Sequence, residues 1–270
     1  MQKGIVLGLN RIVSPSLSLP IFLTLAERSG FGAVELRNDL GKTDVTDGLG
    51  VEIWKNTTLR IVSINALQRF NDDEEKLSTR YSELQEMVRI SRLIGVESIV
   101  LCPVNDKNDA RSKEQRMEDT TRALGIYGPL FLDSGIQGLV EPLGFVSSSL
   151  RYKKDALDAI DQSGFPACYQ LVHDTFHHYL SGEQELYPHR TALVHVSSVT
   201  VPTPLSSVVD DARLLPASSD ELGSQDQIDK LLRGGFCGCI SFEAFSPKVQ
   251  ALSLSQLESA LHESLKLFAL

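Results

Sequence analysis

Short apolar segments alternate with longer amphipathic segments along the whole chain. Eight apolar runs have the length of strands that are buried on both faces. They predict strands at Ile5–Leu9, Ala33–Leu36, Arg60–Asn65, Ser98–Pro103, Gln137–Glu141, Cys168–Val172, Ala192–Val196 and Cys237–Glu243. The segments between them predict helices near residues 19–29, 48–56, 74–94, 113–134, 151–163, 177–186, 224–233 and 254–268. Strict alternation of strand and helix indicates parallel strands joined by right-handed crossovers.

Glycines mark the ends of several predicted helices. Gly30, Gly135 and Gly164 each follow a helical segment and precede an apolar residue that leads into the next strand. Glycine is favoured there because the residue after a helix often adopts a left-handed conformation. The recurrence supports a repeated βα unit of about 34 residues, close to the unit size of an eight-stranded barrel. We therefore predict a single (β/α)8 TIM barrel, with one domain covering residues 1–270.

An open, doubly wound sheet is the alternative to the barrel. That fold would favour a glycine-rich phosphate-binding loop after the first strand. The residues after Leu9 are Asn10 and Arg11, and no such loop follows them. The closed barrel is therefore the preferred prediction.

Composition and charge narrow the classes of partner. The chain has 42% hydrophobic and 23% charged residues, which is typical of globular proteins, and its net charge is −9. It contains no run of Lys and Arg, so we expect no nucleic-acid partner and no membrane partner. No apolar run approaches the ~20 residues that span a bilayer, and the first strand is too short for a signal peptide. We expect a cytoplasmic protein and leave open whether it forms a homodimer.

The four cysteines do not form a disulfide framework in a chain of this length. Cys237 and Cys239 lie two residues apart on the last predicted strand, where they share one face. No second pair of cysteines accompanies them to complete a zinc site. We interpret the pair as core packing.

The last four predicted strands deliver candidate ligands to one rim of the barrel. Barrel enzymes gather their active sites at the C-terminal ends of the strands. Strands five to eight carry Glu141, Asp174, His195 and Glu243 at or near these ends. Three carboxylates and one imidazole form an oxygen-rich set that suits Mn²⁺, Mg²⁺ or Co²⁺, and Zn²⁺ is also compatible. The pattern predicts one divalent metal ion at this rim.

Each of these residues has a simpler interpretation when it is taken alone. Glu141 could cap the next helix, Asp174 could belong to a turn, and His195 could be a hydrogen-bonded core residue. Glu243 is harder to explain in this way, because an unpaired buried carboxylate is costly. Four metal-competent side chains in the same structural position favour a metal site.

Two further features lie on the same rim. His177 follows Asp174 by three residues, so both face the barrel mouth, and we predict that His177 binds a substrate hydroxyl or carbonyl. His173 is expected to point into the helix layer. A long connection, Ser197–Leu222, follows strand seven on the C-terminal face, where long loops usually carry function.

With these residues, the chain resembles the xylose isomerase-like barrel superfamily of sugar isomerases and epimerases over essentially its whole length. The inosose (2-keto-myo-inositol) isomerases are the nearest match within it. The matching pieces are Asn10, Val34-Glu35-Leu36-Arg37, Asn65-Ala66-Leu67, Phe70-Asn71, Glu141, Asp174-Thr175-Phe176-His177, Val194-His195, Asp210-Asp211-Ala212-Arg213 and Phe242-Glu243-Ala244-Phe245. The Asn-Ala-Leu and Phe-Asn pieces are the most specific to the subfamily.

The resemblance implies an activity and a set of site residues. It implies that one divalent ion (Mn, Zn, Co or Mg) is held by Glu141, Asp174, His195 and Glu243. It also implies a substrate-binding set made of His177, Arg213, Asn65 and Asn10. The implied reaction is isomerisation or epimerisation of a sugar or cyclic polyol ketone through an enediolate. Glu141 and Glu243 would be the catalytic pair, with one removing a proton and the other returning it.

The chain also departs from the family pattern. Ser147 stands where related epimerases have a second Glu, Ser197-Ser198 replaces an acidic pair, and Pro216-Ala217-Ser218-Ser219 replaces a Pro-Gly-x-Gly motif. These changes spare the metal set but fall on the expected pocket wall, so the identity of the substrate stays open.

Two rival functions can be weighed against the isomerase. An endonuclease-IV-like DNA-repair enzyme needs three metals and additional histidines, yet this chain has no His between residues 196 and 261. A non-catalytic barrel that binds a sugar or polyol is the other rival. The presence of both Glu141 and Glu243 argues against it.

Overall fold

In the computed structural model, eight parallel strands form one closed barrel, as the alternation predicted. Neighbouring strands follow chain order, and the last strand pairs with the first. The strands are β1 (Val6–Asn10), β2 (Ala33–Arg37), β3 (Arg60–Gln68), β4 (Ser98–Cys102), β5 (Gln137–Val140), β6 (Tyr169–Asp174), β7 (Thr191–Val196) and β8 (Cys239–Phe242). The structure describes residues 4–42, 44–200 and 208–268.

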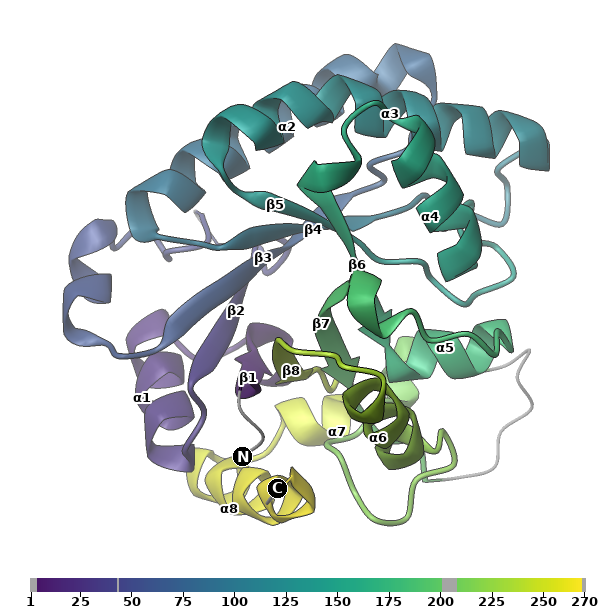
Figure 1. The fold of residues 1–270 in the computed structure, drawn as a ribbon. Coiled ribbons are helices and arrows are strands. Elements are labelled where there is room, and N and C mark those ends of the chain that lie inside the picture. Colours follow the sequence, from purple (N-terminus) through teal and green to yellow (C-terminus); the bar gives the residue numbers. More distant parts are fainter. Residues whose placement is uncertain (1–3, 43, 201–207, 269–270) are drawn as a thin grey trace.

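Helices surround the barrel on all sides (Figure 1). They are α1 (Leu19–Ser29), α2 (Glu74–Ile94), α3 (Lys113–Ser134), α4 (Lys153–Gln162), α5 (Thr175–Ser181), α6 (Ser224–Arg233), α7 (Pro247–Gln250) and α8 (Leu254–Leu265). Helix α3 packs between α2 and α4, and α8 lies beside α1, so the last long helix contacts the first. Within the described ranges, no helix has both the length and the apolar character needed to cross a bilayer.

Apolar side chains form two layers separated by the barrel wall. The outer layer joins strands to helices and includes Leu9, Val34 and Ile64. A smaller group inside the barrel includes Val172 and Leu193. Successive residues of a strand point to opposite sides, so each strand contributes to both layers.

Two predicted helices differ from the structure. The α-helix expected near residues 48–56 is wrong, because this segment forms only a 3-10 helix at Val51–Asn56. Gly48 and Gly50 adopt positive φ values of 75° and 71°, and glycine disfavours a continuous helix. The helix expected at 177–186 spans Thr175–Ser181 instead, ending where Gly182 adopts a left-handed conformation.

Of Cys237 and Cys239, which were interpreted as core residues, only Cys239 is buried. Cys239 packs inside the barrel, whereas Cys237 is exposed. Both are free thiols.

The long connection after β7 is described in part. Residues 201–207, which include Pro202 and Pro204, lie outside the described residues. Beyond them, Asp210–Ala212 forms a 3-10 helix, and Ser198 pairs with Leu214 in an antiparallel bridge. The backbone of this connection therefore returns to the end of β7 and brings Arg213 to the barrel mouth.

Candidate metal centre

The side chains at the ends of β5 to β8 meet inside the barrel. Residues two apart on a strand face the same side of the sheet. A residue two or four positions after an inward-facing residue therefore also points inward. The inward-facing residues Leu139, Val172, Leu193 and Cys239 lie two or four positions before Glu141, Asp174, His195 and Glu243. One ligand atom from each of these four residues lies within 4.8 Å of the others. The expected convergence is therefore present in the structure.

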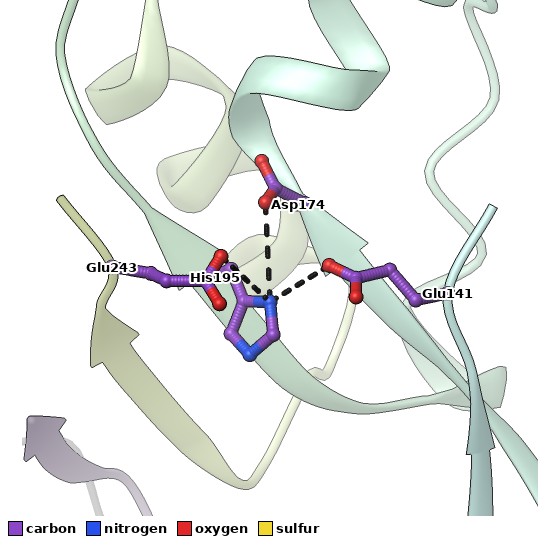
Figure 2. A group of neighbouring side chains, drawn as sticks. All are labelled: Glu141, Asp174, His195 and Glu243. Atoms are coloured by element: carbon purple, nitrogen blue, oxygen red, sulfur yellow. Dashed lines mark hydrogen bonds and ion pairs between the residues drawn. The ribbon is translucent and has the colours of Figure 1, made fainter. Parts of the chain in front are cut away.

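One ring nitrogen of His195 is the common point of this group, and Figure 2 shows the three carboxylates directed at it. Nδ1 of His195 lies 2.8 Å from Glu141, 3.3 Å from Glu243 and 3.9 Å from Asp174. Glu141 and Glu243 lie on opposite sides of the imidazole ring. The set thus has the donor atoms and the spacing of a small cation site.

Buried charge around the centre is unbalanced. The carboxylates of Glu35, Glu141, Asp174 and Glu243 are all buried, and the buried guanidiniums beside them are those of Arg37 and Arg213. With all four carboxylates ionised and the imidazole of His195 neutral, four negative charges face two positive charges. A divalent cation supplies the two missing charges, so the residues present fit a bound metal ion.

The pKa values show the same imbalance. Burial raises the pKa of Glu243 to about 8. Burial alone would lower the pKa of His195, but the carboxylates of Glu243, Glu35 and Glu141 raise it well above its usual value. His195 and Glu243 thus shift toward the forms that reduce the surplus negative charge. The pKa values of Glu35, Glu141 and Asp174 are instead lowered despite their burial, because His195 lies beside Glu35 and Glu141 and Arg213 lies beside Asp174.

Arg213 contacts two of the four candidate ligands. Its Nη2 donates to Asp174 at 2.6 Å and to Glu243 at 2.8 Å. The guanidinium carbon lies 5.0 Å and 4.8 Å from the ring centres of Phe176 and Phe245. Arg213 is therefore held in one orientation at the mouth of the site.

A cavity of about 280 Å³ opens above the centre. Its lining includes Glu141, Glu243, Asn65, His177 and Arg213. Nδ1 of His177 is buried and has no hydrogen-bond partner among the described residues. An unpaired buried polar atom is costly, so this nitrogen is ready to bind a polar group in the cavity.

The remaining two predicted substrate-binding residues contact Glu243. The side-chain amides of Asn65 and Asn10 donate to the same oxygen of Glu243, at 3.2 Å and 3.0 Å. Asn65 also lines the cavity, whereas Asn10 is fully buried and lies behind Glu243, away from the cavity lining.

Three residues near the centre were not in the predicted set. Glu35 accepts from Nε2 of His195, Arg37 donates to Glu243 at 3.1 Å, and the thiol of Cys102 donates to Glu141 at 3.2 Å. Glu35 and Cys102 lie on inward-facing positions of their strands. The two-residue periodicity of a strand could have placed Glu35 inside the barrel, because it follows the inward-facing Ala33 by two positions.

Two of the serines that depart from the family pattern, Ser197 and Ser147, lie near the cavity but have different contacts. Ser197 is buried and accepts from Nε of Arg213 at 3.1 Å, so it orients a residue of the cavity. Ser147 donates to Asn105 at 2.6 Å and lines a neighbouring cavity that shares Phe145 with the first. Neither serine is part of the lining of the cavity above the candidate metal centre.

Comparison with known proteins identifies a family. Residues 23–269 match the family model described as xylose isomerase-like TIM barrel. A search of curated proteins gives no significant sequence match.

Solved structures with the same fold cover almost the whole chain. A xylose isomerase domain containing protein from Salmonella typhimurium is 31% identical, with a TM-score of 0.88, over 100% of this chain and 98% of that protein. The IolI protein, solved with a zinc atom, is 19% identical, with a TM-score of 0.85 and 97% of each chain covered. A D-allulose 3-epimerase from Methylomonas sp., solved with D-allulose, is 15% identical, with a TM-score of 0.74 and coverage of 98% and 96%. The last two show a shared fold.

Proposed function

The chain belongs to the xylose isomerase-like TIM barrel family, and on this premise we propose that it is a metal-dependent isomerase or epimerase of a sugar or cyclic polyol ketone. The convergence of Glu141, Asp174, His195 and Glu243 below a small cavity is the observation that carries the proposal. Epimerases and a zinc-binding protein on similar barrels support it.

Under this proposal, the four converging side chains hold one divalent ion. The zinc atom of the IolI protein supports Zn²⁺, while the oxygen-rich donor set is equally compatible with Mn²⁺, Co²⁺ or Mg²⁺. A bound ion would polarise the carbonyl of the substrate and acidify the neighbouring C–H bond.

Under the same proposal, Glu141 and Glu243 move the proton. One carboxylate removes the proton from the carbon beside the carbonyl, and the electron pair of the C–H bond shifts toward the carbonyl oxygen to give an enediolate. The other carboxyl, which starts protonated, gives its proton to that carbon in an epimerisation. In an isomerisation it gives the proton to the former carbonyl carbon, while the hydroxyl proton moves to the former carbonyl oxygen. Glu141 and Glu243 lie on opposite sides of the His195 ring, which suits transfer on opposite faces of a substrate bound between them.

The cavity favours a small, polar substrate. A volume of about 280 Å³ lies at the low end for ligand pockets, which suits a molecule of about six carbons. His177 would hydrogen-bond a hydroxyl or carbonyl, because its Nδ1 lacks a partner among the described residues. Arg213 and Asn65 would complete the polar wall, and Leu143 and Phe145 close one side of it.

Proton exchange in D₂O tests the reaction directly. Inososes and ketohexoses are incubated with the metal-loaded protein, and deuterium at the carbon beside the carbonyl is followed by NMR. We expect uptake with at least one substrate and its loss in both Glu141→Gln and Glu243→Gln. Glu97→Gln, which alters only an exposed ion pair with Arg60, is the matched control and keeps full exchange. Absence of exchange with every substrate would favour a non-catalytic binding protein.

Metal analysis tests the ligand set separately. We expect one divalent ion per chain in the wild-type protein and a substantial loss in Glu141→Gln and Glu243→Gln. Full retention of the ion in both variants would overturn the assignment, whatever the activity.

A further inference from the structure

A fourth carboxylate lies directly behind the histidine of the centre. Oε2 of Glu35 is 3.1 Å from Nε2 of His195, on the side of the ring away from the other three carboxylates. Both side chains are completely buried. Glu35 comes from β2, which is far from β7 in the strand order, so the contact crosses the interior of the barrel.

The partners of Glu35 settle which way this hydrogen bond runs. The hydroxyl of Ser63 donates to Oε2 of Glu35 at 2.6 Å, and the amide of Asn10 donates to Oε1 at 3.2 Å. Both oxygens of Glu35 therefore act as acceptors, and His195 must supply the proton on Nε2. A proton on Nε2 leaves the lone pair of Nδ1 free to face Glu141, Asp174 and Glu243 in the neutral ring.

We propose that Glu35 is a positioning residue for the metal site, which sets the orientation of the His195 ring and directs the lone pair of Nδ1 toward the ion. This inference rests on the metal site of the proposed function. Carboxylates that accept from a ligating imidazole raise its basicity and typically contribute 10–100-fold to metal affinity. Ser63 and Asn10 hold Glu35 in turn, so β1, β2 and β3 support a ligand that belongs to β7.

A purely structural role for Glu35 predicts a different outcome. If the carboxylate only joined strands inside the barrel, its loss would lower stability and leave the metal affinity of the folded protein unchanged. Glu35→Gln separates the two roles. Its amide can donate to Nε2, which would leave the proton on Nδ1, where the ion must bind.

The test compares metal dissociation constants of folded proteins. Calorimetric titration with Zn²⁺ and with Mn²⁺, using a competing chelator, is carried out on the wild type, Glu35→Gln, Ser63→Ala and Asp119→Asn. We expect roughly 10–100-fold weaker binding in Glu35→Gln and a smaller loss in Ser63→Ala, which keeps the carboxylate but removes one donor to it. Asp119→Asn removes a carboxylate paired with Arg111 and Arg122 and leaves the affinity unchanged. Equal affinity in the wild type and Glu35→Gln would overturn the proposal.

Nitrogen-15 NMR of the His195 ring gives a second readout. We expect a slowly exchanging Nε2–H proton in the wild type and in Asp119→Asn, and its loss or a large shift in Glu35→Gln. If Glu35→Gln does not fold, Ser63→Ala decides the question by the same two measurements. A wild-type protein that binds neither ion overturns the proposed metal site. The NMR signal then decides the contact by itself, because an unchanged Nε2–H proton in Glu35→Gln excludes the Glu35 hydrogen bond.

Discussion

Lys153 is a buried ionisable residue outside the barrel interior, and its side-chain amine contacts two histidine rings and no carboxylate. Its Nζ lies 3.0 Å from Nδ1 of His173 and 3.0 Å from Nδ1 of His178, and His173 also contacts Gln227. His173 points into the helix layer, as its position beside Asp174 predicted. Burial lowers the pKa of Lys153 to about 7 and the pKa of His178 to about 3. The folded chain therefore favours the neutral forms of both groups.

This cluster predicts the sign of a pH effect on stability. Between a pH of about 7 and 10.5, the unfolded chain keeps the Lys153 proton that the folded chain has lost. Stability rises with pH wherever the unfolded state binds more protons, so the free energy of unfolding should increase across this window. His178 acts in the same direction between about 3 and 6.5, where stability falls as the pH falls.

Urea unfolding at several pH values checks this prediction. Lys153→Met should remove most of the rise in the alkaline window, a change on the order of 5 kcal/mol. Lys154→Met, at an exposed neighbour paired with Asp158, should retain the rise and is the control. Parallel pH profiles for the wild type and Lys153→Met would contradict the prediction.

Replacing Arg213 by lysine is expected to lower activity. A lysine has a single point charge and cannot contact Asp174 and Glu243 while stacking between two phenylalanine rings. We expect Arg213→Lys to lose about 2 kcal/mol of transition-state stabilisation, or roughly 30-fold in kcat/KM. Steady-state kinetics with the exchanging substrate measures the loss. Arg190→Lys, at a surface pair with Asp161, should be neutral, and equal losses in both variants would refute a specific role for Arg213.

At the scale of elements, hydrophobic periodicity predicted every strand of the barrel to within a few residues. Helices with clear ends, such as Leu19–Ser29 and Lys113–Ser134, were also predicted with their observed bounds, because glycines in left-handed conformations follow them. The apolar pattern of the segment at Val51–Asn56 predicted an α-helix. The segment forms a 3-10 helix instead, because the two glycines before it adopt positive φ values.

The candidate ligands were predictable for the same reason, since a strand end defines which rim a side chain reaches. Contacts across the barrel were not predictable in this way. The bonds from Asn10 to Glu35 and to Glu243 depend on how far neighbouring strands are shifted along one another, which one strand's pattern does not reveal. The resemblance assigned Asn10 to the substrate, whereas in the structure its amide nitrogen donates to two carboxylates and its amide oxygen accepts from the backbone of Ile12.

The loop after β5 makes a close approach to α5 that is testable. A Cβ at Gly144 would lie 2.1 Å from the carbonyl oxygen of His177 and 2.8 Å from Cβ of Leu180. Gly144→Ala should displace α5, reduce the free energy of unfolding by about 1–3 kcal/mol and lower kcat/KM by moving His177. Urea unfolding and kinetics measure these effects. Val146→Ala, at a side chain that is 80% exposed, should change neither.

At the scale of the whole molecule, a bound ion should stabilise the barrel, because its candidate ligands come from four separate strands or strand ends. An ion at 100 times its Kd adds about 2.7 kcal/mol, which corresponds to a rise of roughly 5–10 °C in the Tm of a chain of this size. Thermal unfolding with Zn²⁺ or Mn²⁺, compared with a chelator, measures the difference. Glu141→Gln should show little dependence on the ion, and a similar rise in that variant would indicate binding elsewhere.

The contact between Asn10 and Glu243 joins two residues that are 233 positions apart, one at the end of β1 and one just after β8. During protein synthesis, β8 leaves the ribosome after every other strand. Until then the edges of β1 and β7 have no partner, and three of the four candidate ligands face an open rim. Under the proposed function, translation order would make tight metal uptake a late event, and a nascent chain would acquire its ion only as the ring closes.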